Sequence, residues 1–345
     1  MQALVYSDLR RVTMQERPEP TLSPDEVLLK VRGTGICGSD MVGFLGLSPR
    51  RQPGLVLGHE TVATVARMPQ TAPPNGGEWP FHEGERVVIN PFMPCGKCDA
   101  CKAGRVNVCT AWRLIGMDKI DGTFAEWAKA PATNVFPVPD SLSDERAIMI
   151  EPLANGVHLF SLIRQHHFGT LAIFGAGTQG CLLLSVARLL GYRDIAIVDV
   201  NPARLEVAKT LGAKHLINAR ETDSVAAIRD CFGGKGADIV IEAYGDAVTR
   251  AASVQAARRG GEILLLGLHE VMSSVDFTTI VRHELRLQGS FVYTDADFAR
   301  SKTLIETGDV DLSPWTKTYP LARGQEAFDK LLTDPGPTMK IVLTS

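Results

Sequence analysis

The stretch LAIFGAGTQG, residues 171–180, decides the fold of the second half of the chain. A short apolar run leads into glycines at positions 175, 177 and 180, and a helical pattern follows them. In this spacing Gly175 permits a tight turn, Gly177 lets the backbone approach a pyrophosphate, and Gly180 lets the helix pack closely on the strand. The stretch therefore predicts a strand, a phosphate-binding turn and a helix, with Thr178 and Gln179 as further residues of the turn.

An acidic residue strengthens this interpretation. Asp199 lies nineteen residues after Gly180, near the end of the apolar run DIAIVDV. A carboxylate there can accept hydrogen bonds from an adenosine ribose and would repel a 2′-phosphate, so the pattern favours NAD over NADP. Arg204 works against that preference, because an arginine near the site could help to hold a phosphate. Two alternatives stay open: a related fold without this cofactor, and Asp199 as an ordinary strand-end residue.

The sequence around the glycines alternates between predicted buried strands and predicted helices. Apolar runs on both faces of the strands indicate a parallel sheet that is covered on two sides. Six strand candidates are enough for a doubly wound dinucleotide-binding fold. The candidate strands are residues 171–177, 194–200, 214–218, 237–245, 262–268 and 285–291, and the helices between them are 178–191, 201–212 and 246–260.

The first 150 residues have a different sequence pattern. Short β-like runs separated by Gly and Pro predict a mostly antiparallel, barrel-like domain, and residues 70–85 read as a surface loop. The last run, MKIVLTS, is a strand that can return to pair with this first domain. A chain of 345 residues is long enough for two domains. We expect a catalytic domain over residues 1–152, a cofactor domain over 153–290, and a return to the catalytic domain over 291–345.

Composition excludes several classes of protein. The formal net charge is −3, and Lys and Arg are scattered, so there is no basic field that would attract nucleic acid. No run approaches the ~18 apolar residues that a membrane span needs, and the first twenty residues lack the apolar region of a signal peptide. We expect a cytoplasmic protein with no membrane partner. His166 and His167 fall in a polar connection, where a solvated role is expected.

Four of the seven cysteines lie within fifteen residues, as CGKCDACKAGRVNVC. Two-residue gaps let successive thiolates face one tetrahedral centre, and the longer last gap lets the chain close it. Four sulfurs saturate Zn²⁺ and leave no open position, so the site is structural. A ferredoxin cluster is disfavoured because the fourth cysteine follows after seven residues rather than three. The predicted ligands are Cys95, Cys98, Cys101 and Cys109.

A second, open metal site is indicated by three separate stretches. GICGSD contributes Cys37, LGHE contributes His59, and EPLA contributes Glu151. One sulfur, one nitrogen and one oxygen are the three protein ligands of a catalytic zinc, with the fourth position free. Each residue alone is weak evidence, since a free cysteine usually serves only as a small apolar side chain.

Taken together and in order, GICGSD, GHE, the four-cysteine loop, DGTFAEW, EPLA and FGAGTQG resemble the zinc-containing medium-chain dehydrogenase/reductase family. The resemblance covers essentially the whole chain. It implies a GroES-like β-barrel catalytic domain joined to a Rossmann domain. Glu151 is similar to the ligand of the sorbitol and polyol dehydrogenase branch, and the text of residues 289–312 looks most like the enzymes that act on sugar acids and polyol phosphates, such as L-idonate and galactitol-1-phosphate dehydrogenases.

The resemblance also implies roles for single residues. Cys37, His59 and Glu151 would bind the catalytic zinc, with Glu60 beside it as a ligand that replaces water, as a group bonded through water, or as the partner of a nearby cation. Ser39 matches the hydroxyl of the family's proton relay. Val42 departs from the family, because many relatives carry a histidine there, so the next group of the relay is in doubt.

The implied reaction is the transfer of a hydride from a secondary alcohol to NAD, which gives a ketone. The implied substrate is a polyol, sugar acid or sugar phosphate, the implied cofactors are NAD and two zinc ions, and the implied assembly is a homo-oligomer, a dimer or a tetramer. A primary-alcohol or threonine dehydrogenase on the same scaffold is the enzymatic alternative. A retired relative that binds zinc without catalysis and a nucleic-acid-binding zinc ribbon are the alternatives from other classes.

Overall fold

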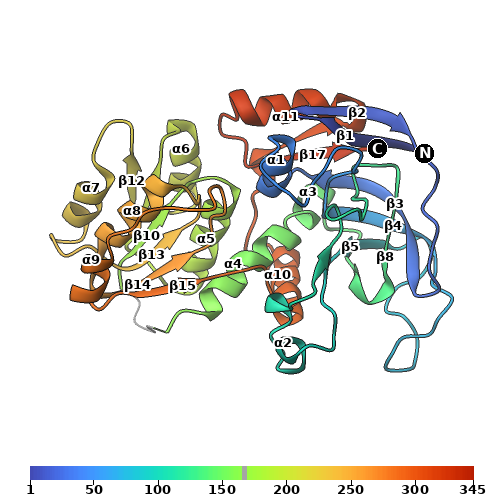
Figure 1. Ribbon diagram of the computed structural model, residues 1–345, viewed down its shortest axis with the longest axis horizontal. Helices are drawn as coiled ribbons and strands as arrows, with labels where there is room; N and C mark the ends of the chain where they lie inside the picture. The colour runs from blue at the N-terminus through green and yellow to red at the C-terminus, as the bar shows by residue number, and fades with distance from the viewer. Residues whose placement is uncertain (165–168) are drawn as a thin grey trace. The chain divides into compact units, whose positions relative to one another are not determined.

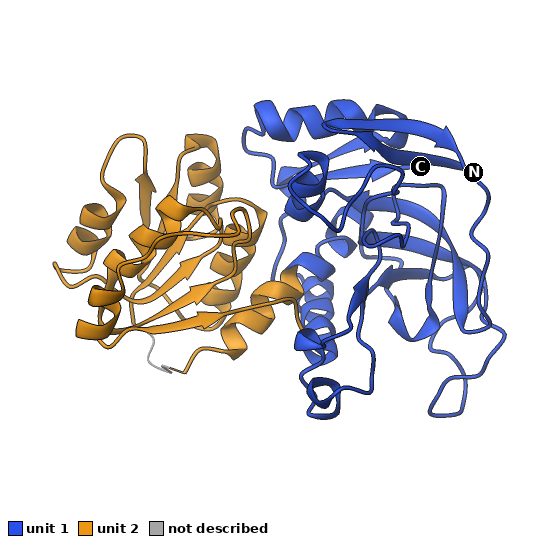
Figure 2. Cartoon of the chain, in the orientation of Figure 1, with its two compact units in different colours: residues 1–152, 294–345 blue, residues 153–293 orange. Residues whose placement is uncertain are grey.

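The computed structural model describes residues 1–164 and 169–345 (Figure 1). His166 and His167 lie outside the described residues. The chain forms two compact units (Figure 2). Unit 1 contains Met1–Pro152 and Thr294–Ser345, and unit 2 contains Leu153–Tyr293. Unit 1 is thus built from two segments that are separated in sequence by the whole of unit 2.

Unit 1 is organised around a seven-stranded, mostly antiparallel sheet. Its order is β16-β17-β3-β4-β5-β9, and β8 also pairs with β3. The last strand returns to this sheet, with Val342 opposite Gly35, which brings the end of the chain beside the strand that leads to Cys37. The strands are β3 (Glu26–Gly35), β4 (Glu60–Arg67), β5 (Arg86–Ile89), β8 (Trp127–Pro131), β9 (Val135–Pro137), β16 (Thr316–Pro320) and β17 (Lys340–Thr344).

Smaller elements complete unit 1. An apolar core joins a two-stranded ribbon to a C-terminal helix, and the ring of Phe328 lies 4.8 Å from that of Phe44 and 6.0 Å from that of Phe124. The strands are β1 (Gln2–Asp8), β2 (Arg11–Glu16), β6 (Phe92–Met93) and β7 (Arg113–Leu114). The helices are α1 (Gly38–Phe44), α2 (Asp99–Lys102), α3 (Asp144–Ala147), α10 (Asp295–Thr307) and α11 (Gly324–Thr333), with 3₁₀ turns η1 (Val106–Val108), η2 (Ala132–Asn134), η3 (Ser313–Trp315) and η4 (Leu321–Arg323).

Unit 2 is a doubly wound α/β domain with a six-stranded parallel sheet. The strands lie in the order β12-β11-β10-β13-β14-β15, so the chain adds strands on one side of β10 first and then, from β13, on the other side. The boundary between β10 and β13 is the switch point at which such sheets bind ligands. The strands are β10 (Leu171–Phe174), β11 (Ile195–Asp199), β12 (His215–Asn218), β13 (Ala237–Glu242), β14 (Ala257–Leu265) and β15 (Arg286–Gly289). The helices are α5 (Thr178–Leu189), α6 (Pro202–Thr210), α7 (Ser224–Cys231), α8 (Ala247–Ala256) and α9 (Phe277–Arg282), and α4 (Ile150–Ser161) runs from unit 1 into unit 2.

The fold class predicted from the sequence is confirmed, although the bounds of several elements differ and helices α7 and α9 were not predicted. The helix expected over residues 246–260 ends at Ala256, because Ala257 already pairs with Ala237 of β13. Gly260 has φ +70°, a conformation that no α-helix can include. None of the helices in residues 1–164 and 169–345 combines the length and the apolar character that crossing a membrane requires.

Candidate metal and cofactor sites

The four clustered cysteines meet around one point in unit 1. Their sulfur atoms all lie within 4.8 Å of one another. The Sγ of Cys98 is 3.5 Å from that of Cys101 and 3.8 Å from that of Cys109. Tetrahedral Zn²⁺ with bonds of about 2.3 Å sets its sulfurs about 3.8 Å apart. The arrangement therefore fits a closed zinc site.

Backbone amides favour thiolates in this cluster. The N–H groups of Cys95 and Ala111 donate to the Sγ of Cys109, at 3.3 and 3.4 Å. Donation from the amides of Cys101 and Thr110 lowers the pKa of the Cys98 thiol to about 6. Since the thiolate is the form that binds a metal, these amides prepare Cys98 for it. Desolvation and the neighbouring Cys98 have the opposite effect on Cys101 and raise the pKa of its thiol to about 12.

The second predicted metal site draws on three places in unit 1. Cys37 immediately precedes α1, and Ser39 lies in the first turn of that helix. His59 comes directly before β4, whose first residue is Glu60. Glu151 lies in the first turn of α4.

Asp40 organises the inner side of this region. Its buried carboxylate accepts from the amide of Cys37 at 3.1 Å and lies 3.5 Å from Nδ1 of His59. Burial alone would raise the pKa of Asp40, but His59 and Arg51 hold it below its usual value. Burial would likewise lower the pKa of His59, but the Asp40 carboxylate raises it well above the usual range. A carboxylate behind one imidazole nitrogen is the arrangement that directs the other nitrogen toward a metal.

The ligand candidates are close together but not equally close. Cys37 interacts with the His59 imidazole and contributes to its raised pKa, after burial and Asp40. The Oγ of Ser39 lies 3.5 Å from Nε2 of His59. Within the part of the chain that the structure describes, only the four clustered cysteines form a group of three or more ligand atoms all within 4.8 Å. The ligand atoms of Cys37, His59 and Glu151 are therefore not all within that distance of one another. The donor set of thiolate, imidazole and carboxylate, with Asp40 behind the imidazole, suits a zinc ion.

Glu60 is held by a cation that the sequence did not reveal. The ammonium of Lys340 donates to Oε1 at 2.7 Å and lies 2.6 Å from Oε2, out of hydrogen-bonding alignment with the second oxygen. Both side chains are buried, at 0% and 3% exposure. A Cβ at position 35 would lie 2.3 Å from Oε2 of Glu60, so only glycine leaves room for this carboxylate. Of the three interpretations of Glu60, the structure displays the ion pair.

The pKa of Lys340 also depends on other acidic groups in this region. Burial would lower the pKa of its ammonium, but Glu60 and then Cys37 raise it, and Glu151 adds to the effect. Lys340 thus carries positive charge into a region that holds several negative groups.

Removing this cation is predicted to be costly. Lys340→Met leaves the Glu60 carboxylate buried without a partner and should lower the free energy of unfolding by about 3–5 kcal/mol. The matched control is Lys330→Met, which breaks the Lys330–Asp334 pair, where the side chains are 31% and 77% exposed; its effect should stay below about 1 kcal/mol. Urea unfolding of both variants measures the difference, and equal losses would contradict the prediction.

The glycine-rich turn of unit 2 follows β10 and opens α5. Gly175 has φ +100°, which only glycine adopts easily. A Cβ on Gly180 would lie 1.7 Å from the carbonyl oxygen of Gly175, so the third glycine is required for the close approach. Gly177 precedes α5, and Thr178 and Gln179 form its first turn, half-buried. A helix N-terminus behind such a turn is suited to a phosphate.

Asp199 and Arg204 both adjoin this turn. The Asp199 carboxylate accepts from the amides of Ala176 at 2.7 Å and of Asn201 at 2.8 Å. It thereby ties the end of β11 to the turn and is only half-buried, so further acceptor sites face outward. Arg204, on α6, has a guanidinium nitrogen 3.7 Å from where a Cβ on Gly177 would stand. An acceptor for a ribose and a cation near the phosphate turn are thus both present.

Sequence reasoning missed three residues of unit 1. Asp40 could have been identified as a site residue from the sequence, because it directly follows Ser39 in the GSD motif. Lys340 carried no local signal, since it reaches Glu60 across 280 positions. Arg51 falls in a stretch without a regular pattern, which gives no sign that the structure buries it beside Ser39.

Comparison with known proteins agrees with these observations. Residues 23–140 match the model of the alcohol dehydrogenase GroES-like domain, and residues 180–307 match that of zinc-binding dehydrogenases. Sorbitol dehydrogenase of Bacillus subtilis (strain 168) is 32% identical over 99% of this chain and 97% of that protein. L-threonine 3-dehydrogenase of Alteromonas mediterranea is 30% identical over 99% of both proteins.

Solved structures give the same result. The crystal structure of L-idonate 5-dehydrogenase from Escherichia coli superposes with a TM-score of 0.88 at 26% identity, and covers 100% of this chain and 98% of that one. Family models and relatives thus extend over both units. The chain therefore belongs to the zinc-containing medium-chain alcohol dehydrogenase family.

Proposed function

We propose that the protein oxidises a secondary alcohol of a polyol, sugar acid or sugar phosphate to a ketone, with NAD as the hydride acceptor and zinc at the catalytic centre. The observation that carries the proposal is the position of Asp40 at Nδ1 of His59, with the Ser39 hydroxyl at Nε2 and Cys37 interacting with the same imidazole. The names of the sorbitol and L-idonate dehydrogenases to which the chain is similar support the substrate class.

The proposed ligands of the catalytic zinc are Cys37, His59 and Glu151. One thiolate and one carboxylate balance the charge of Zn²⁺, so an anionic oxygen can bind without repulsion. When bound, zinc lowers the pKa of an alcohol and polarises a ketone. Glu60 can serve as an alternative ligand only if it leaves Lys340. Cys95, Cys98, Cys101 and Cys109 are the proposed ligands of the structural zinc.

The remaining steps belong to side chains of this protein. Asp40 keeps the His59 imidazole in one orientation. The Ser39 hydroxyl takes the proton of the alcohol, and the turn formed by Gly175, Gly177 and Gly180 holds the NAD pyrophosphate. The alcohol gives up one hydride to NAD⁺ and one proton to solvent, which balances the reaction.

The proposed preference for NAD rests on Asp199. Asp199→Ala should lower kcat/KM for NAD by about 10- to 100-fold, because hydrogen bonds to a charged group are lost, and should raise kcat/KM for NADP by removing the repulsion of its phosphate. Asp194→Ala is the control, since that carboxylate binds Lys214 and His215 instead. Steady-state assays with both cofactors measure the ratio, which a general loss of folding would not change. An unchanged ratio would contradict the role of Asp199.

Three further statements complete the proposal. The functional division is a catalytic domain over residues 1–152, a cofactor domain over 153–290 and a return segment over 291–345. The compartment is the cytoplasm. The assembly is a homo-oligomer, a dimer or tetramer, which is supported by large apolar side chains of unit 2 that are 68–97% exposed: Leu268, Val271, Met272, Phe277 and Val281. Light scattering after size exclusion tests the assembly, and a monomer at micromolar concentration would refute it.

A panel of substrates tests the central proposal. Polyols, sugar acids, sugar phosphates, a primary alcohol and L-threonine are each offered with NAD, and formation of NADH is read by absorbance. Turnover of a secondary alcohol of the first three classes is expected. Preference for threonine or a primary alcohol would favour the alternative dehydrogenases, and no turnover together with one zinc per chain would favour a retired relative.

A further inference from the structure

Arg51 is a buried charge in an otherwise exposed loop. Its side chain is 3% exposed, whereas the next three residues, Gln52 to Gly54, are exposed. The Nη2 of Arg51 donates to the Oγ of Ser39 at 3.1 Å, and its Nε lies 3.7 Å from Oδ1 of Asp40. Buried arginines need partners, and here both partners belong to the first turn of α1.

The fold makes room for this side chain. A Cβ at position 43 would lie 2.5 Å from Cδ of Arg51 and 3.0 Å from its Cβ. The stem of Arg51 therefore crosses α1 at Gly43, a helical position where alanine would be more stable if nothing lay above it. The position of the Arg51 side chain therefore explains why residue 43 is a glycine.

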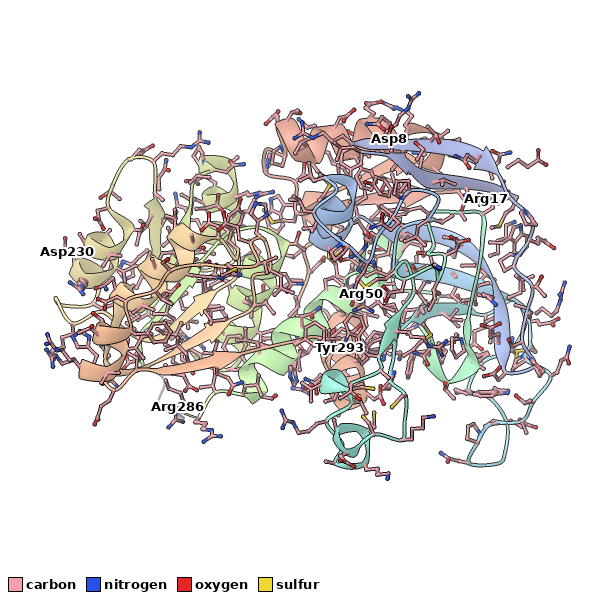
Figure 3. The ribbon with its side chains drawn as sticks, viewed as in Figure 1. Asp8, Arg17, Arg50, Asp230, Arg286 and Tyr293 are labelled. Atoms are coloured by element: carbon pink, nitrogen blue, oxygen red, sulfur yellow. The ribbon has the colours of Figure 1, made fainter. Side chains whose placement is uncertain are left out.

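The preceding residue fixes the loop from the other side. Arg50 is labelled in Figure 3. Its guanidinium binds the Asp118 carboxylate and lies 3.7 Å from the centre of the Trp112 ring. The amide of Asp118 donates to the carbonyl oxygen of Arg50 at 2.9 Å. Because Arg50 is held on the outside of the loop, Arg51 is directed inward to Ser39.

We propose that Arg51 is a positioning residue of the reaction, which holds the Ser39 hydroxyl in the orientation that receives the proton of the alcohol. This inference rests on the proposed role of Ser39. The Arg51 N–H occupies one lone pair of Oγ and leaves the other lone pair for the alcohol and the O–H for an outgoing bond. Val42 offers no polar group, and His59, whose Nε2 lies 3.5 Å from the Oγ, is a proposed zinc ligand, so Arg51 is assigned the role of fixing this rotor.

The guanidinium group limits what Arg51 can do in the reaction. It stays protonated at any working pH and cannot accept a proton. The proton that leaves the alcohol therefore passes through Ser39 to water and never through Arg51, and the hydride goes to NAD⁺. Arg51 orients the hydroxyl without taking part in the transfer.

Three variants test this. Arg51→Met should lower kcat by about 10- to 100-fold, the range for loss of one charge-assisted hydrogen bond, while KM changes less than about threefold. Arg51→Lys, whose ammonium can still donate to Ser39, should recover most of the rate. In a Ser39→Ala background, Arg51→Met should cost less than about threefold more, because the group it positions is already gone. Zinc content by mass spectrometry and NADH affinity by fluorescence should equal those of the unaltered protein.

A gentler variant covers the case in which Arg51→Met does not fold. Gly43→Ala pushes the arginine stem aside while keeping its charge, and should lower kcat in the same way. Gly156→Ala is the control, because a Cβ there meets nothing closer than 3.7 Å. Full additivity of the Arg51 and Ser39 effects, or a loss confined to KM for anionic substrates, would overturn the positioning role. Absence of turnover in the unaltered protein would instead refute the proposed function.

Discussion

Replacing Cys37 by serine is expected to leave a folded protein with kcat lowered by roughly 10³-fold or more. The catalytic zinc is proposed to supply several kcal/mol of stabilisation to the developing charge on the alcohol oxygen, and a serine hydroxyl is a poor substitute for a thiolate ligand. Cys37 is half-buried at the start of α1, so the change removes little packing. The melting temperature should change by less than about 3 °C.

Zinc counting makes this prediction specific. The Cys37→Ser protein should hold about one zinc per chain fewer than the unaltered protein, or bind it at least about 10-fold more weakly. Cys231→Ser is the control, because it makes the same chemical change in a half-buried cysteine of unit 2. Near-normal turnover of Cys37→Ser would refute its assignment as a ligand.

Cys98→Ser should have the opposite pattern, a large loss of stability and a small loss of rate. Binding of a structural zinc contributes directly to folding. Removal of one of four ligands should therefore lower the melting temperature by about 10 °C, while kcat at low temperature stays within about threefold. The cluster holds together a segment with only short elements, α2, η1 and β7, so little else would keep it ordered.

The measurement for Cys98→Ser combines circular dichroism with the same zinc assay. An unchanged melting temperature would show that the cluster does not stabilise the fold. A folded variant without activity would show that the cluster takes part in the reaction. The contrast between Cys37→Ser and Cys98→Ser separates the two proposed zinc roles in a single experiment.

The sequence predicted those parts of the molecule whose contacts are local. Gly175, Gly177 and Gly180 indicated the turn between β10 and α5, and the structure shows the local reason for two of them: Gly175 has a positive φ, and Gly180 closely approaches the carbonyl of Gly175. The strands of the parallel sheet were predicted from short apolar runs, whereas β16 of the other sheet, with the sequence TKTYP, was not. The fold class is confirmed. The spacing of the clustered cysteines predicted that their sulfurs would meet, as they do. That either site holds zinc stays a prediction.

Other features could not be predicted, because they depend on the register between distant strands. Lys340 reaches Glu60 only because β17 and β4 flank β3, with Gly35 opposite both Val342 and Glu60. Arg51 lies in a loop with no period, and its burial follows from the gap at Gly43 and the outward anchoring of Arg50. The local pattern of residues therefore predicts neither the position of Lys340 nor that of Arg51.

The return of β17 to unit 1 has a consequence for synthesis. A ribosome that adds about 5–20 residues per second makes Lys340 roughly 14–56 s after Glu60. During that interval β3 lacks one of its neighbours, and the Glu60 carboxylate has no cation. Unit 2, whose sequence is continuous, can fold first. The sheet of unit 1 is therefore complete only after the final strand has been made.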